Sequence, residues 1–163
     1  MNESVLADWK RASFTAEGVT RDTYRRGRGP GVIVIHEIPG ITPNVTRFAN
    51  EVVESGFTVV MPDLVGTPGK APSVPYTLRS IATVCVAKEF TTWALGETSP
   101  IIGWLRALGR DLHAELGGPG IGAVGMCFSG GFALAMTVDD HLAAPVLSQP
   151  SLPFPITKRH GAD

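Results

Sequence analysis

Short runs of apolar, β-branched residues alternate along this chain with segments whose apolar residues recur at helical spacing. The run at residues 31–35, Gly-Val-Ile-Val-Ile, is apolar throughout, which is typical of a strand covered on both faces. Comparable runs lie at residues 57–61, 121–126 and 143–148. Strands that are separated by helices usually pair in parallel. The alternation therefore predicts a three-layer α/β fold, in which a mostly parallel sheet carries helices on both faces.

Start and stop signals locate the helices between these strands. Threonine followed by proline at residues 42–43 predicts the start of a helix, and Gly56 predicts its end. Another helix is expected over residues 99–116. Its apolar face consists of Ile101, Trp104, Leu105, Leu108, Leu112 and Leu116. Glycine and proline are frequent in residues 65–75, which predicts a surface loop, while residues 77–95 carry mixed helical signals.

Composition limits the classes of protein to which the chain can belong. With 163 residues, 44% of them hydrophobic, and a formal net charge of −1, one globular domain is expected. The densest basic stretch, residues 21–28, is short and broken by glycine, so nucleic acid is not an expected partner. No segment approaches the roughly 18 apolar residues of a membrane span, and charged residues precede any signal-like apolar run. We therefore expect a cytoplasmic protein without a membrane partner.

The chain has two cysteines, Cys85 and Cys127, which we expect to be thiols rather than a disulfide. Cys85 is embedded among small apolar residues, which favours a packed core thiol. No cluster of His, Cys, Asp or Glu has metal-ligand spacing, and we expect no metal and no cofactor. Residues 120–125 formally match Gly-x-Gly-x-x-Gly, but this stretch runs through the predicted strand instead of opening a helix, which argues against dinucleotide binding.

The most informative segment is Gly-Met-Cys-Phe-Ser-Gly-Gly at residues 125–131, between a predicted strand and a helix expected to continue to about Met136. Small residues allow a sharp turn that presents Cys127 above the sheet, which is the context of a nucleophile elbow. A helix N-terminus also favours the thiolate form. The alternative is a buried structural cysteine in a glycine-rich turn.

This segment resembles the Gly-x-Cys-x-Gly-Gly elbow of the dienelactone hydrolase family, a branch of the α/β-hydrolases that uses cysteine as its nucleophile. Two other segments agree in order and spacing with that family. Val-Ile-His-Glu-Ile-Pro-Gly at residues 34–40 is similar to the family's strand-end motif, and Met-Pro-Asp-Leu at residues 61–64 is similar to its Pro-Asp-Leu turn. The resemblance covers residues 30–148 and implies a hydrolase of small carboxylic esters or lactones.

The resemblance also implies roles for individual residues. Cys127 would attack the substrate carbonyl, and Glu37 would influence the protonation of the thiol. The backbone N–H groups of Ile38 and Phe128 would form the oxyanion hole. Arg79 is the candidate for the family's arginine near the substrate carboxylate, although a solvated helix arginine is the alternative. The family has glycine where this chain has serine, two residues after the nucleophile, and we expect a residue this small to preserve the turn.

In this fold an acid and then a histidine follow the nucleophile along the chain. The downstream candidates are Asp139, Asp140, His141, His160 and Asp163. The first three should lie at the opposite end of the sheet from Cys127, and the last two belong to a polar tail. His36 and His113 show only the features of ordinary structural or surface histidines.

We therefore expect residues 1–163 to form a single incomplete domain that lacks the C-terminal strands and ends after about the sixth strand. Its incomplete sheet would favour self-association. Three functions remain open: a cysteine-dependent hydrolase that is impaired in this chain, a catalytically inactive remnant, and a small-molecule binder or redox-sensitive thiol protein.

Overall fold

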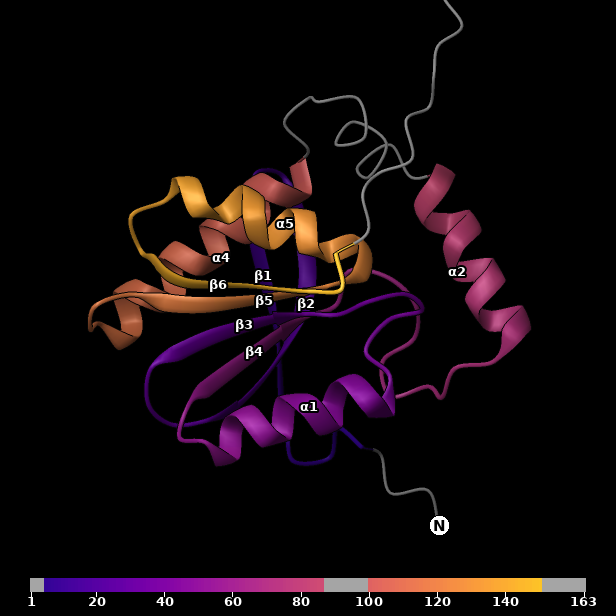
Figure 1. The fold of residues 1–163 in the computed structure, drawn as a ribbon, viewed down its shortest axis with the longest axis horizontal. Coiled ribbons are helices and arrows are strands. Elements are labelled where there is room, and N and C mark those ends of the chain that lie inside the picture. The colour runs from indigo at the N-terminus through magenta and orange to yellow at the C-terminus, as the bar shows by residue number, and fades with distance from the viewer. Residues whose placement is uncertain (1–4, 87–99, 151–163) are drawn as a thin grey trace, which may run out of the picture.

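The computed structural model describes residues 5–86 and 100–150 (Figure 1). These residues contain a six-stranded sheet with the order β1-β2-β4-β3-β5-β6. The strands are β1 (Lys10–Ala16), β2 (Val19–Gly27), β3 (Gly31–Ile35), β4 (Thr58–Pro62), β5 (Ile121–Met126) and β6 (Leu142–Ser148). Strands β4, β3, β5 and β6 are parallel, whereas β1 and β2 pair antiparallel at one edge. The fold is the predicted mostly parallel α/β sheet.

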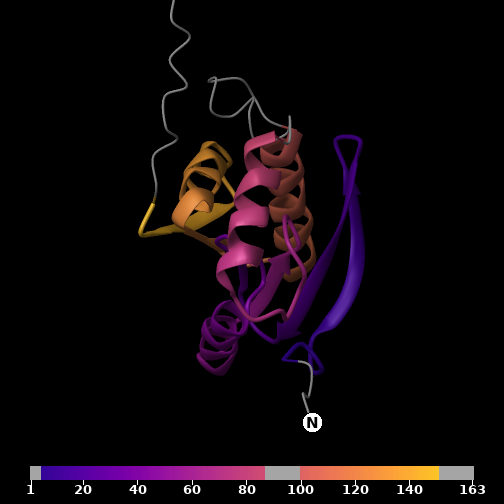
Figure 2. The same ribbon diagram turned by 90° about the vertical axis from the view of Figure 1, so that its right-hand side faces the viewer.

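Helices cover both faces of this sheet. They are α1 (Pro43–Glu54), α2 (Val74–Val86), α4 (Pro100–Leu116) and α5 (Gly130–Ala135). Short 3-10 turns flank α5, namely η1 (Cys127–Ser129) and η2 (Met136–Val138). Helix α1 packs on one face and α4 and α5 pack on the other, while α2 stands beyond the carboxyl ends of the parallel strands (Figures 1 and 2). No helix in these ranges is both long and apolar enough to cross a membrane.

Strand β3 shows why both faces are apolar. Its side chains alternate between the two halves of the core, because successive residues of a strand point to opposite faces. Ile33 and Ile35 pack with α4 and α5, whereas Val32 and Val34 pack with α1. All four are buried, so the continuous apolar run of the sequence reflects burial on both sides. Removing either helical layer would expose one of these two sets.

The antiparallel hairpin of β1 and β2 was not among the predicted elements. Its sequence is mostly polar, and its turn places Glu17 and Gly18 at positive φ of 52° and 73°. Polar side chains pair along its exposed face, as in the contact of Thr15 Oγ1 with Thr20 Oγ1 at 2.8 Å. The stretch at residues 21–28 is thus largely a strand whose arginines bind within the domain, with Arg25 forming two hydrogen bonds to Glu115.

The remaining elements agree with the sequence analysis to within a few residues. Helix α1 has Thr42 as its N-cap, whose hydroxyl accepts the N–H of Val45 at 3.4 Å. Helix α4 buries the predicted apolar face, with Leu116 partly buried at its end. Helix α2 begins at Val74, earlier than expected. The expected helical residues 87–95 lie outside the described ranges.

Candidate active site

The site lies at the ends of two neighbouring strands, β3 and β5, which are followed by helices on opposite faces of the sheet. Strands β3 and β5 pair in parallel with Ile35 opposite Gly125. From β3 the chain continues into α1 on one face, and from β5 it continues into α5 on the other. In α/β sheets, ligands bind at such a point, outside the carboxyl ends of the strands. We call this edge of the sheet, at the carboxyl ends of β3 and β5, the crevice. Glu37 and Cys127, each two residues beyond the paired positions, leave the sheet at this same edge.

Cys127 occupies an unusual backbone conformation in this crevice. Its φ is +55°, in the left-handed region that residues other than glycine rarely adopt. A Cβ atom at Gly125 would lie 2.4 Å from the carbonyl oxygen of Ser129 and 2.8 Å from Cα of Gly130. The turn is therefore so tight that position 125 requires glycine. Non-glycine residues with this conformation cluster at functional sites, because the surrounding structure must hold them there.

Ser129 supplies much of that support. The side chain is fully buried, and its hydroxyl accepts the N–H of Met126 at 2.8 Å. The hydroxyl oxygen also lies 2.9 Å from the carbonyl of Ile35 and 2.8 Å from that of Met126, to either of which it can donate its single proton. The expectation that serine preserves the turn is confirmed. Serine also ties the turn to the end of β3, which glycine could not do.

His36 fixes the same edge from the other side of β3. Its ring is fully buried, and its Nε2 accepts the N–H of Leu64 at 3.1 Å. Its Nδ1 therefore carries the proton and donates to the carbonyl of Glu37 at 2.8 Å. Burial lowers the pKa of His36 to about 4. The ring is thus a neutral structural group, as the sequence indicated, with both nitrogens engaged.

The two candidate oxyanion donors come from the two connections that border the crevice. Phe128 directly follows Cys127 in η1, and Ile38 is the third residue after β3. Both residues are half-buried. The segment that carries Ile38 is closed by a hydrogen bond from the N–H of Gly40 to the carbonyl of Glu37 at 2.9 Å. The two candidate donors therefore lie on separate connections at the same edge of the sheet.

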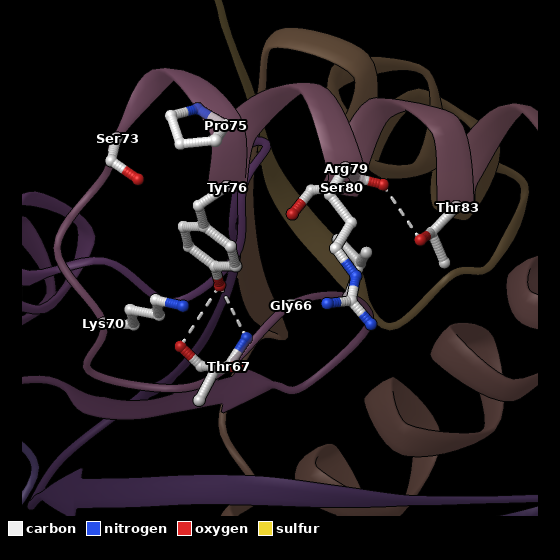
Figure 3. Close-up of a pocket in the computed structure, with 10 residues that line it drawn as sticks. Gly66, Thr67, Lys70, Ser73, Pro75, Tyr76, Arg79, Ser80 and Thr83 are labelled. Carbon is white, nitrogen blue, oxygen red and sulfur yellow. Dashed lines mark hydrogen bonds between the residues drawn. The ribbon is translucent and has the colours of Figure 1, made fainter.

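A cavity of about 540 Å³ adjoins this segment beneath α2 (Figure 3). It is lined by Val65, Gly66, Thr67, Lys70, Ser73, Pro75, Tyr76, Arg79, Ser80 and Thr83. Arg79, the predicted substrate contact, lies in its wall. Gly66 in the cavity wall packs directly against the segment after β3, because an added Cβ there would lie only 1.9 Å from the carbonyl oxygen of Pro39. Two cations and several hydroxyl groups make the cavity suited to an anionic or strongly polar group.

The downstream acidic residues lie where the sequence placed them, away from the crevice. The carbonyl of His141 accepts the N–H of Ile121, which is the first residue of β5, at 2.8 Å. Asp139 is bound by Arg106 through two hydrogen bonds of 2.6 and 2.8 Å. This cluster is therefore at the opposite end of β5 from the turn of residues 127–129. His160 and Asp163 lie outside the described residues, as does the side chain of Cys85.

Other features were visible only in the structure. Asp63 directly follows β4, and its N–H donates to the carbonyl of Asp22 in β2 at 2.9 Å. Burial together with the nearby charge of Asp22 raises the pKa of Asp63 to about 6. The sequence contained this aspartate in its Pro-Asp-Leu motif but gave no indication of its burial. Lys70 and Tyr76 line the cavity as well. Lys70 belongs to the predicted loop of residues 65–75 and Tyr76 directly follows it, and neither residue was singled out by a motif. The Gly-x-Gly-x-x-Gly match occupies β5 itself, as expected.

A match to a family model shows which protein family this chain belongs to. The model of the Dienelactone hydrolase family matches residues 17–159. The chain belongs to the dienelactone hydrolase family. This match runs from the start of β2 past the end of β6, so Cys127 and the residues that line the cavity lie within the region shared with the family. No curated protein matches the sequence.

Solved structures agree with this family in fold. The dienelactone hydrolase-like promiscuous phosphotriesterase P91 from metagenomic libraries has a TM-score of 0.60 and 19% identity over 88% of this chain and 59% of its own. A structure named m3DLH has a TM-score of 0.56 and 20% identity over 90% of this chain and 61% of its own. The epoxide hydrolase VrEH1 from Vigna radiata gives 0.54 and 16%, over 86% and 40%. The chain thus spans between 40% and 61% of these structures.

Proposed function

We propose that this chain carries the nucleophilic half of a hydrolase that cleaves small carboxylic esters or lactones, with Cys127 as the nucleophile. The main support is the positive φ of +55° at Cys127, in a turn between β5 and α5 at the crevice. A structural cysteine has no need of this conformation, whereas a nucleophile at a sharp strand-to-helix turn does. Membership of the dienelactone hydrolase family supports the same reaction class.

In the proposed reaction the thiol of Cys127 loses its proton to water, and the sulfur of the thiolate forms a bond to the substrate carbonyl carbon. The oxygen becomes negatively charged and accepts hydrogen bonds from the backbone N–H groups of Ile38 and Phe128. The carbonyl then re-forms, the bond to the alcohol oxygen breaks, and the alcohol leaves with a proton. Glu37 is proposed to influence the protonation of the thiol, because it leaves the sheet beside Cys127. The product at this stage is a thioester on the protein.

The cavity beneath α2 supports a preference for substrates with an anionic group. Arg79 and Lys70 both line it, and Arg79 is the proposed contact for a substrate carboxylate. A guanidinium group can bind a carboxylate through two parallel hydrogen bonds. Because the cavity adjoins Pro39, a carboxylate held there would leave the ester group of a small substrate close to the crevice.

Release of the thioester requires a base that activates water, and a positioned base typically contributes about 10² to 10⁴ in rate. Among the residues that the structure describes, the histidine at this edge is His36, whose two ring nitrogens are already engaged. We therefore propose that the 163-residue chain is acylated once and turns over slowly. An inactive remnant or a binding protein would show no rapid release of one equivalent that depends on Cys127.

The test is acylation by p-nitrophenyl acetate, followed by p-nitrophenol release and by intact mass. We expect the wild-type chain and a Cys85→Ala control to release one equivalent rapidly and to gain one acetyl group. Cys127→Ala should do neither. Equal acetylation of the wild-type chain and Cys127→Ala would contradict the proposed nucleophile, and sustained turnover by the wild-type chain would show that a base is present.

We also propose that the chain is cytoplasmic and self-associates through β6, with a second copy as the partner. Within the described ranges β6 pairs on one side only, and its exposed side chains include Val146 and Leu147. The other edge strand, β1, begins with Lys10 and Arg11, charges that discourage pairing between sheets. Light scattering after size-exclusion chromatography should show dimers or larger species, fewer when Val146 is changed to Lys. A monomer at all concentrations would contradict this proposal.

A further inference from the structure

Tyr76 connects three separate backbone segments beside the cavity. Figure 3 shows its hydroxyl bonded to the backbone of Thr67. Its hydroxyl oxygen accepts the N–H of Thr67, in the loop after β4, at 2.6 Å. Its proton can go to the carbonyl of Pro39, in the segment after β3, at 3.2 Å, with the carbonyl of Thr67 at 3.4 Å as the alternative. Because Tyr76 itself belongs to α2, one side chain joins the helix that carries Arg79 to both strand ends.

The two strand-end segments that Tyr76 joins pack directly against each other through backbone. At Gly66, whose φ is +88°, an added Cβ would lie 1.9 Å from the carbonyl oxygen of Pro39 and 2.6 Å from the hydroxyl of Tyr76. At Gly40, whose φ is +139°, it would lie 2.5 Å from the carbonyl oxygen of Val65. This close approach leaves no room for a side chain between the segments. Gly40 and Gly66 thus allow the segments after β3 and β4 to pack closely, and the hydroxyl of Tyr76 bonds to both segments.

The ring of Tyr76 is held from its other side. The ammonium group of Lys70 lies over the ring at 4.3 Å from its centroid, a favourable cation–π arrangement. The hydroxyl is therefore presented to the backbone of Pro39 by a side chain that is fixed at both ends. Fixed geometry matters here, because an oxyanion donor stabilises the developing charge only when it is already in place.

We propose that Tyr76 is a positioning residue for the ester cleavage described above, on which this inference rests. It fixes the carbonyl of Pro39 and thereby the backbone of Ile38, whose N–H is the second oxyanion donor. Through the same hydrogen bonds Tyr76 fixes the position of α2, which carries Arg79, relative to the segment after β3. Tyr76 makes no contact with the reacting atoms in this account, so its effect passes through the Ile38–Pro39 backbone.

The experiment compares the wild-type chain with Tyr76→Phe, which removes one hydroxyl and keeps the ring. Ser55→Ala is the matched control, because the Ser55 hydroxyl also donates to a main-chain carbonyl, that of Glu51 at 2.8 Å, but at the end of α1 and outside the cavity lining. Three quantities are measured: the rate at which p-nitrophenyl acetate acetylates Cys127, the rate at which iodoacetamide alkylates it, and amide hydrogen exchange over residues 37–42 and 64–69.

For Tyr76→Phe we expect acetylation to slow about tenfold, since small displacements of a reacting geometry have large effects on rate. Alkylation should be unchanged, because displacement of iodide at a saturated carbon develops no oxyanion. Amide exchange should become faster in both segments, most directly at Thr67, which loses its acceptor. Ser55→Ala should match the wild-type chain in all three measurements.

Other results would overturn the proposal. Equal loss of acetylation and alkylation would mean that Tyr76 supports the fold in general rather than the oxyanion donor. Unchanged exchange in Tyr76→Phe would mean that the hydroxyl does not hold the Ile38–Pro39 backbone, and faster exchange with unchanged acetylation would mean that this backbone does not serve the reaction. If the wild-type chain is not acetylated at Cys127, the proposed function itself fails, and with it the role of Tyr76 in catalysis.

Discussion

At the amino ends of β5 and β6 polar side chains bind one another, whereas at the carboxyl ends of β3 and β5 they bind backbone. At the amino ends, the carboxylate of Asp139 takes both of its hydrogen bonds from Arg106. At the carboxyl ends, the buried side chains of Ser129 and His36 hold the main chain of the turn and of the neighbouring strand ends. In the first arrangement the charged groups are bound to each other, so few of their hydrogen-bonding positions remain for a ligand. The second holds a cysteine in a strained conformation, which is why the crevice is the candidate site.

The largest expected effect comes from Gly125, because the tightness of the turn depends on it. Gly125→Ala places a Cβ 2.4 Å from the carbonyl oxygen of Ser129, so the turn must open, at a cost of about 3 kcal/mol or more in the free energy of unfolding. Gly122→Ala in the same strand is the control, since its Cβ would meet the side chain of Val32 at 3.4 Å. Chemical denaturation measures both. If both variants lost the same free energy of unfolding, the turn would be no more sensitive to an added Cβ than the strand before it.

A second prediction concerns the pH dependence of stability at the carboxyl ends. The pKa of His36 is lowered from 6.5 to about 4, so the folded state binds fewer protons than the unfolded chain between these values, and stability falls as the pH drops through them. His141, whose pKa burial also lowers, acts in the same direction. Asp63 acts in the opposite direction, because its pKa is raised from 3.8 to about 6 and ionisation above this range disfavours the folded state.

The contributions of His36 and Asp63 oppose each other in the wild-type chain, so its stability should fall less between pH 6.5 and pH 4 than that of a variant without the Asp63 carboxyl. In Asp63→Asn the opposing contribution is gone. We expect this variant to lose roughly 2 to 3 kcal/mol of unfolding free energy over the same interval. Denaturation at a series of pH values gives both curves. Parallel curves for the two proteins would show that the burial of Asp63 has no energetic consequence.

The smallest expected effect comes from the amino ends. Asp139→Asn keeps the shape of the side chain but removes the charge that Arg106 binds, which should cost about 1 kcal/mol. Because this cluster lies at the far end of β5, the rate of alkylation of Cys127 should be unchanged. A slower alkylation rate in Asp139→Asn would mean that the two ends of the strands are coupled and that the contrast drawn here is too simple.

The sequence predicted those parts of the fold that follow from local chemistry. The apolar run of β3, the Thr42 cap of α1 and the apolar face of α4 are local patterns, and all three are present. The hairpin at residues 10–27 was missed because its polar residues pair across the exposed face of two strands and leave no apolar alternation.

In the candidate site, too, features that depend on local sequence could be predicted and those that depend on long-range contacts could not. Cys127 and Glu37 could be singled out because each follows a recognisable strand in a short motif. The roles of Ser129 and Tyr76 could not be predicted, because their hydrogen-bond partners, Ile35 and Pro39, are distant in sequence. The burial that raises the pKa of Asp63 likewise depends on packing between segments far apart in the chain.

The central claim is that the turn after β5 presents Cys127 as a reactive thiol, and timed alkylation with iodoacetamide tests it most directly. Native protein is labelled for a series of times and both cysteines are quantified by peptide mass mapping. We predict that Cys127 reacts faster than Cys85, which sits in an apolar stretch of α2, and that the difference disappears when the protein is unfolded. Equal rates in the native protein, or faster labelling of Cys85, would contradict the claim.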